Sequence, residues 1–196
     1  MNMFTYDLGP LFERFQDSEY SFHFHEFFRT DENGDFVHEQ HVDNFLDLMC
    51  DPSDESNYPF STKKYQEYFR HTFWLVPGVK EALALQRKLE KHPIFCNFDI
   101  VNVAGDGDPD DTKGEALHKV RDAISEKPKQ DYTITLSCGK LTTGVTVKEW
   151  TAVFMLSGGA KTGAAGYMQT IFRVQSPGQI DGKQKTDAYV FDFAPD

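Results

Sequence analysis

Two short groups of residues in the C-terminal third of the chain have the chemistry to hold phosphate. Thr142, Thr143 and Gly144 form a threonine-glycine loop whose main-chain amides can donate hydrogen bonds to phosphate oxygens. Further along the chain, Gln169 and Arg173 are four positions apart and therefore share one face of a helix. A phosphate-holding loop followed by an arginine that can reach a phosphate suggests a protein that works with nucleoside triphosphates.

Each group also has a simpler interpretation. Thr142 to Gly144 could be an ordinary turn in which the hydroxyls bind nearby amides. Arg173 could be the partner of a structural salt bridge. Because both groups occur in sequence order within one segment, we favour the phosphate interpretation over the two structural ones.

Strands and helices alternate from residue 61 onward and must position these groups. Apolar runs predict strands at 72–76, 99–104, 132–136, 151–156 and 186–193, and helical spacing predicts helices at 65–70, 79–89, 116–124 and 163–174. This alternation predicts an α/β fold, a RecA-like, mostly parallel sheet with helices on both faces. Because ligands bind at the carboxyl ends of such strands, we expect both groups at that edge.

The first 60 residues differ in character from the rest. An aromatic stretch, an Asp/Gly turn and a second short apolar run predict a β-hairpin, and apolar residues at helical spacing then predict a helix. These segments are 20–28, 31–35, 36–38 and 42–49. We therefore interpret residues 1–60 as an N-terminal β-hairpin/helix appendage and 61–196 as the main domain.

Charge is distributed unevenly along the chain. The net charge of −11 argues against a general nucleic-acid binder, which is expected to be basic. Residues 132–185, however, contain six basic and two acidic residues, a net +4 that leaves −15 for the rest. The segment with the phosphate-binding motifs is thus electropositive within an acidic protein. This pattern fits a phosphate-facing surface, and it also fits a chance distribution on a solvated face.

The remaining composition indicates a cytoplasmic protein. No run approaches the roughly 18 apolar residues of a membrane helix, and the N-terminus lacks the basic start and apolar core of a secretory signal. The three cysteines, Cys50, Cys96 and Cys138, are an odd number without metal-like spacing, so we expect reduced thiols. We expect no membrane partner.

Four stretches occur in the order found in a known family. HTFWLVPGV, DIVNVAGDGD, TITLSCGKLTTGVTVKEW and YMQTIFRVQSP begin at residues 71, 99, 133 and 167. In this order they resemble the C-terminal RecA-like lobe of superfamily 2 (DEAD/DEAH-like) helicases. The resemblance is greatest to the subunits of bacterial restriction-modification and related defence systems. It covers roughly residues 61–196.

The resemblance implies roles for the motif residues. Thr142, Thr143 and Gly144 match motif V, which contacts the nucleic-acid backbone and senses nucleotide. Gln169 and Arg173 match motif VI, usually Q-x-x-G-R-x-G-R, which supplies arginine to ATP. We therefore assign Arg173 and Gln169 as the catalytic candidates of a DNA helicase or translocase lobe.

Motif VI departs from its usual form. Phe172, Gln175 and Ser176 stand where glycine, glycine and the last arginine are expected. Arg173 is therefore the one candidate in this helix for the arginine that reaches the triphosphate.

The chain lacks the other half of such a motor. It contains no G-x-x-x-x-G-K-[ST] and no DEAD or DEAH box. The nearest string, residues 157–162, has Ala160 in place of the glycine before its Lys161-Thr162 pair. We expect ATP and Mg²⁺ to be cofactors of a longer protein that contains the first RecA-like lobe. The fragment alone should bind neither cofactor, should lack ATPase activity and should bind DNA weakly.

Two other functions remain open. The chain could be a non-catalytic, acidic α/β module that binds a protein partner, or a degenerate phosphate-loop enzyme that uses Lys161 and Thr162. We assign no metal site, because the calcium-like loops lack the required glycine and glutamate and the histidines lack zinc-like spacing. These loops begin at Asp31 and Asp106, and the histidines are His23, His25, His38 and His41.

Overall fold

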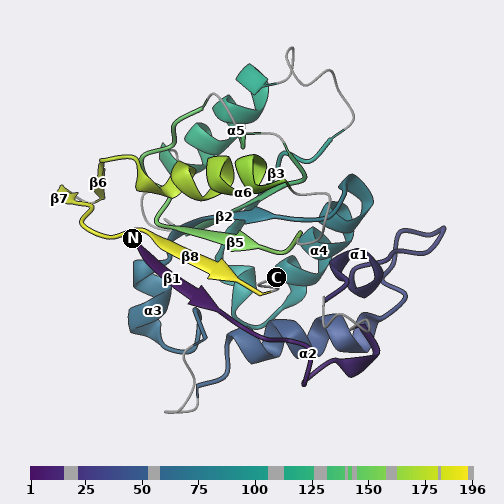
Figure 1. Ribbon diagram of the computed structural model, residues 1–196. Helices are drawn as coiled ribbons and strands as arrows, with labels where there is room; N and C mark the ends of the chain where they lie inside the picture. Colours follow the sequence, from purple (N-terminus) through teal and green to yellow (C-terminus); the bar gives the residue numbers. More distant parts are fainter. Residues whose placement is uncertain are drawn as a thin grey trace.

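Six parallel strands form the centre of the part of the chain that the structure describes (Figure 1). The computed structural model describes residues 1–15, 22–52, 58–105, 113–125, 132–139, 141–142, 145–157, 163–180 and 182–193. The strands are β1 (Asn2–Thr5), β2 (His71–Leu75), β3 (Asp99–Asn102), β4 (Thr133–Ser137), β5 (Ala152–Met155) and β8 (Tyr189–Asp192). Their order is β1-β8-β5-β2-β4-β3, and all neighbours are parallel.

Helices connect these strands as the sequence predicts. The α-helices are α1 (Phe24–Phe27), α2 (Glu39–Met49), α3 (Lys63–Tyr68), α4 (Val79–Lys91), α5 (Lys113–Ser125) and α6 (Ala164–Ile171). Short 3₁₀ helices are η1 (Glu13–Phe15), η2 (Phe95–Asn97) and η3 (Phe172–Gln175), and a small hairpin pairs β6 (Gln179–Ile180) with β7 (Lys183–Gln184). The α/β class and the parallel sheet are confirmed.

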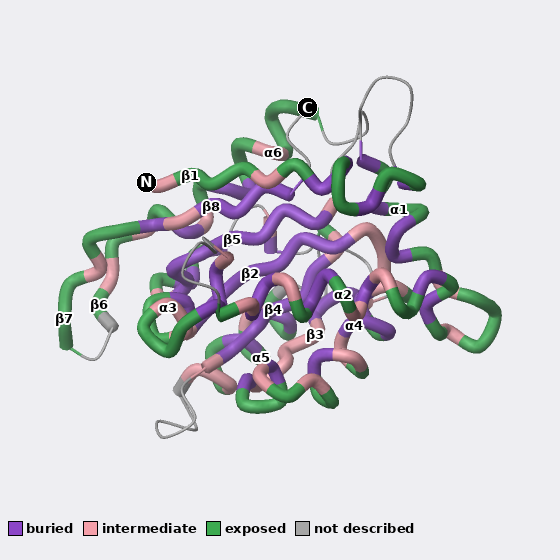
Figure 2. Tube along the Cα trace, turned by 90° about the horizontal axis from the view of Figure 1, so that it is seen from below, coloured by how far each residue is buried: buried purple, intermediate pink, exposed green. Residues whose placement is uncertain are grey.

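Alternate residues of β2, β5 and β8 enter two separate hydrophobic cores, because successive side chains of a strand point to opposite faces. Trp74, Phe154 and Phe191 pack on one face with side chains of α2 and α4. Phe73 and Val153 pack on the other face with side chains of α5 and α6. Figure 1 accordingly shows α5 and α6 above the sheet and α2 and α3 below it. Along β2, β5 and β8, Figure 2 shows a largely buried trace.

The N-terminal segment is built differently from the predicted hairpin. Phe24–Phe27 is helical, so the first predicted arm of the hairpin is wrong, and the turn is closed by an isolated antiparallel bridge between Thr30 and Phe36. Phe24, Phe27 and Phe28 are all buried, and helical spacing brings these aromatic rings onto one side. Burial of several neighbouring aromatics therefore outweighed their alternation with polar residues.

The turn at 31–35 is closed by hydrogen bonds from its main-chain amides to the Asp31 side chain. The Asp31 carboxylate accepts hydrogen bonds from the amides of Asn33 and Asp35, each at 2.9 Å. These bonds lower the pKa of Asp31, the Asp35 amide being the largest cause. The carboxylate that began the calcium-like pattern thus completes a turn.

The first 60 residues join the main sheet and its core. β1 pairs with β8, and the Tyr6 amide donates to the Asp192 carbonyl at 2.8 Å. Phe45 of α2 lies with its ring centroid 5.3 Å from that of Phe193. Helix α2 (predicted over 42–49) is present, and strand β1 was not predicted.

Salt bridges add a second link between α2 and α4. Lys88 on α4 contacts Glu39 at 2.5 Å and Asp43 at 2.9 Å, both on α2. His92, just after α4, lies 3.2 Å from Asp47 near the end of α2. α2 is therefore held along its length against α4.

Two further properties of the described residues bear on the sequence predictions. Each of the three cysteines is a free thiol, with Cys50 buried, Cys96 exposed and Cys138 between them. Among the described helices, none has both the length and the apolar character to cross a membrane.

Candidate phosphate-binding site

The loop after β4 begins with two residues of unusual backbone conformation. Gly139 has φ 134° and Leu141 has φ 63°, a left-handed value that is uncommon outside glycine. The Thr142 hydroxyl donates to the Gly139 carbonyl at 2.7 Å, so its proton serves this tight turn. Thr142 is half-buried, whereas Thr143 and Gly144 lie outside the described residues.

The second half of this loop is anchored in the core. Val145, Val147 and Trp150 are buried with Phe73 of β2 and Ile171 of α6. The main chain continues from Trp150 into β5, whose first residue is Ala152. Because β4 and β5 both run parallel to β2, the loop must cross the sheet from the carboxyl end of β4 to the amino end of β5. We call residues 138–150 the crossing loop.

Arg173 contacts the crossing loop directly. Its Nη1 donates to the carbonyl of Val145 at 2.5 Å, and its Nε donates to the carbonyl of Gln169 at 3.1 Å. The structure thus brings the predicted arginine next to the predicted threonine-glycine loop. Gln169 takes part through its main chain, and its side chain is exposed.

The position of Arg173 on the sheet differs from the expectation. α6 follows β5 and runs back along the sheet, so η3 lies near the amino end of β5. At that end, Lys185 Nζ donates to the carbonyls of both Val174 in η3 and Trp150 before β5. Arg173 therefore lies over one face of the sheet and not at its carboxyl edge. A helix that follows a parallel strand returns antiparallel to it, and the arginine stands at the far end of that helix.

Three basic side chains donate to carbonyls of the crossing loop. Arg121 of α5 contacts the Thr146 carbonyl at 3.5 Å, and Arg173 contacts that of Val145. Lys185, from the segment after β7, donates to the Lys148 and Trp150 carbonyls at 2.9 and 3.0 Å. Of these residues the sequence motifs identified Arg173 alone.

Arg173 and Lys185 bind main-chain carbonyls in this group. In the described part of the chain, neither Arg173 nor Lys185 forms a salt bridge with a carboxylate. Burial lowers the pKa of Lys185 to about 8, while the charge of Glu149 acts in the opposite direction. Half-buried cations that bind only neutral carbonyls can attract an anion such as a phosphate.

The residues present do not fit a magnesium-nucleotide site. Within the described ranges, no group of three or more His, Cys, Asp or Glu side chains could hold a metal ion. Arg173 offers one guanidinium for a phosphate, and among the residues that the structure describes no cluster of carboxylates that could hold Mg²⁺ accompanies it. Lys161, Thr162 and the acidic loop that begins at Asp106 lie outside the described residues.

Tyr167 near the start of α6 has a role that the sequence did not reveal. Its hydroxyl donates to Asp192 Oδ2 at 2.7 Å, at the carboxyl end of β8. Burial, followed by the bond to Asp192, raises the pKa of Tyr167, so the phenol remains protonated at neutral pH. This bond links α6 to β8.

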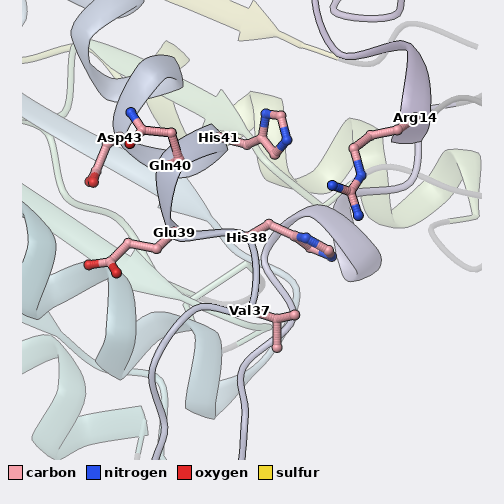
Figure 3. Close-up of a pocket in the computed structure, with 7 residues that line it drawn as sticks. All are labelled: Arg14, Val37, His38, Glu39, Gln40, His41 and Asp43. Atoms are coloured by element: carbon pink, nitrogen blue, oxygen red, sulfur yellow. The ribbon is translucent and has the colours of Figure 1, made fainter.

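A hollow at the start of α2 contains two of the histidines considered as metal ligands. In Figure 3 the side chains of Arg14, His38 and His41 gather on one side, and Glu39 and Asp43 extend to the other. His38 Nε2 lies 2.8 Å from Glu26 Oε1, and the His38 ring packs on Phe15. His38 is thus engaged in the local structure, and His23 and His25 are exposed.

Comparison with known proteins gives one informative similarity. No family model matches the chain. The chain is 34% identical over 167 residues to a protein of Mycoplasma pneumoniae named as a candidate type II restriction enzyme and methyltransferase, RM.MpnORF110P C-terminus. The matched region covers 81% of this chain and 22% of that protein. The chain therefore spans about a fifth of the length of the relative that it matches.

Proposed function

We propose that this chain is the second motor lobe of an ATP-dependent DNA helicase or translocase in a restriction-modification system. The observation that carries the proposal is the bond between Arg173 and the carbonyl of Val145, the residue that directly follows the threonine-glycine motif in the chain. The parallel α/β sheet fits a RecA-like lobe. The name of the Mycoplasma relative supports the restriction-modification context.

In this proposal the crossing loop contacts the nucleic-acid backbone. The main-chain amides of Thr142, Thr143 and Gly144 would donate to phosphate oxygens, and the cations behind the loop would favour that contact. Such contacts position a protein on DNA without reading its sequence. The local excess of positive charge in an acidic protein fits this role, because phosphates are then attracted to one surface only.

ATP and Mg²⁺ belong to the longer protein in this proposal. When bound between two lobes, they would supply the energy of phosphoryl transfer. Arg173 of η3 would contribute a guanidinium from this lobe, with Gln169 near the end of the preceding α6. In this proposal the magnesium ligands would come from the other lobe.

DNA binding by the chain tests the proposal. Fluorescence anisotropy with labelled single- and double-stranded oligonucleotides should detect weak binding at about 50 mM salt that falls steeply toward about 200 mM. Arg173→Ala should weaken this binding. Arg29→Ala is the matched control, because Arg29 is an exposed arginine near α1, on the opposite side of the sheet, and pairs with Glu26.

Three outcomes would overturn the proposal. They are no salt-dependent binding, equal effects of Arg173→Ala and Arg29→Ala, and Arg173-dependent ATP hydrolysis by this chain alone. The first outcome would favour the alternative of an acidic protein-interaction module. The third would favour a nucleotide-binding enzyme that uses its own phosphate loop.

A further inference from the structure

The Lys185 ammonium joins two stretches of main chain beside Arg173. Its Nζ donates to the carbonyls of Lys148 and Trp150 in the crossing loop, and to the carbonyl of Val174 in η3 at 3.0 Å. An ammonium has three N–H donors, and here each has a carbonyl acceptor. Val174 directly follows Arg173, so Lys185 fixes the main chain next to the guanidinium.

Close packing at Gly178 supports the same junction independently. A Cβ atom at Gly178 would lie 2.7 Å from the Lys148 Cβ and 3.0 Å from the Lys148 carbonyl oxygen. The Lys185 amide also donates to the Gly178 carbonyl at 2.8 Å. Gly178 and Lys185, on either side of the exposed β7, are therefore held against the crossing loop, and only glycine fits at position 178.

The contacts of Arg173 and Lys185 together hold η3 against the loop. Arg173 binds the loop at Val145, and Lys185 binds it at Lys148 and Trp150. If the Lys185 bonds were lost, η3 would keep the Val145 contact and could rotate about it. The direction of the guanidinium would then no longer be fixed.

We propose that Lys185 is a positioning residue for Arg173. By binding the crossing loop and η3 at once, its ammonium sets where the Arg173 guanidinium points toward a phosphate. This inference rests on the proposed function for its effect on phosphate binding. Its effect on the loop itself follows from the contacts alone.

Hydrogen exchange of the folded chain tests the positioning directly. Lys185→Met removes the three bonds and keeps an unbranched side chain, and we expect faster exchange at 145–150 and 172–175. Lys183→Met is the matched control, since Lys183 is exposed, lies two residues away and carries the same charge. Equal exchange in the two variants would overturn the inference. If Lys185→Met does not fold, Lys185→Gln keeps two donors and should give the same change, only smaller.

A double-mutant cycle on DNA binding separates positioning from a general structural role. Lys185→Met should weaken binding by about threefold or more in the wild-type background and have no further effect with Arg173→Met. Independent, multiplying effects would overturn the inference, because Lys185 would then act without Arg173. If no variant binds DNA, the proposed function fails, and the exchange comparison alone decides whether Lys185 fixes the loop.

Discussion

Lys185 carries a positive charge in a half-buried position, where burial disfavours the charged form. Burial disfavours the ammonium and lowers the pKa to about 8, although three carbonyls and Glu149 favour the charged form. Its pKa in the unfolded chain is the ordinary value of 10.5. Between these two values the unfolded chain binds more protons than the folded chain, so folding stability contributed by this residue must rise with pH.

The pH dependence of stability should therefore change when Lys185 is replaced. The quantity to compare is the free energy of unfolding of the wild type minus that of Lys185→Met. We expect this difference to be constant below pH 8 and to increase from pH 8 toward pH 10. Urea denaturation at a series of pH values measures it, with Lys183→Met as control. A difference that shrinks over this range would mean that the carbonyls, and not burial, dominate the pKa of Lys185.

Arg173 and Lys185 also mark what residue patterns can and cannot predict. Arg173 could be found because its helix spacing and the preceding threonine-glycine loop form a motif. Lys185 could not, because its acceptors are main-chain carbonyls, which no pattern of side chains marks. The net charge of +4 over residues 132–185 marked the segment that contains Lys185 as electropositive. It did not distinguish Lys185 from Lys183, which lies in the same segment.

How well the sequence predicted each helix and strand depended on how deeply that element is buried. Strands β2 and β4 are buried at every position, and their apolar runs placed them to within about one residue. β1 is an edge strand with three exposed residues, so its four residues carry no strand pattern. The aromatic segment at 20–28 was misread because its polar residues alternate with rings, whereas core packing selects α1.

The contact between the β6–β7 segment and the crossing loop leads to a test at this scale. Gly178→Ala should lower the free energy of unfolding by about 1–3 kcal/mol, since the added methyl overlaps the main chain of Lys148. Urea denaturation measures the change. Gly166→Ala is the control, because a Cβ there meets nothing within 4 Å and alanine favours helix α6. Equal stability of the two variants would mean that the segment moves away from the loop at little cost.

Across the whole molecule, both layers of helices depend on one sheet. The layer below the sheet includes α1 and α2 from the first 60 residues, which share a core with Trp74 and Phe154 (Figure 1). The layer above it includes α5, α6 and the crossing loop. A change in the first layer is therefore expected to act on the stability of the sheet that also carries the candidate site.

This arrangement predicts a single cooperative unfolding transition. Phe45 on α2 is fully buried and contacts Phe193 just after β8, so Phe45→Ala should cost about 3–5 kcal/mol. Tryptophan fluorescence reports on the sheet through Trp74, and far-ultraviolet circular dichroism reports on all helices. We expect both signals to shift together to lower denaturant concentration, because β1 pairs with the sheet and α2 is part of its core. If residues 1–60 formed an independent appendage, Phe45→Ala would produce an early loss of helix while the fluorescence transition stayed in place.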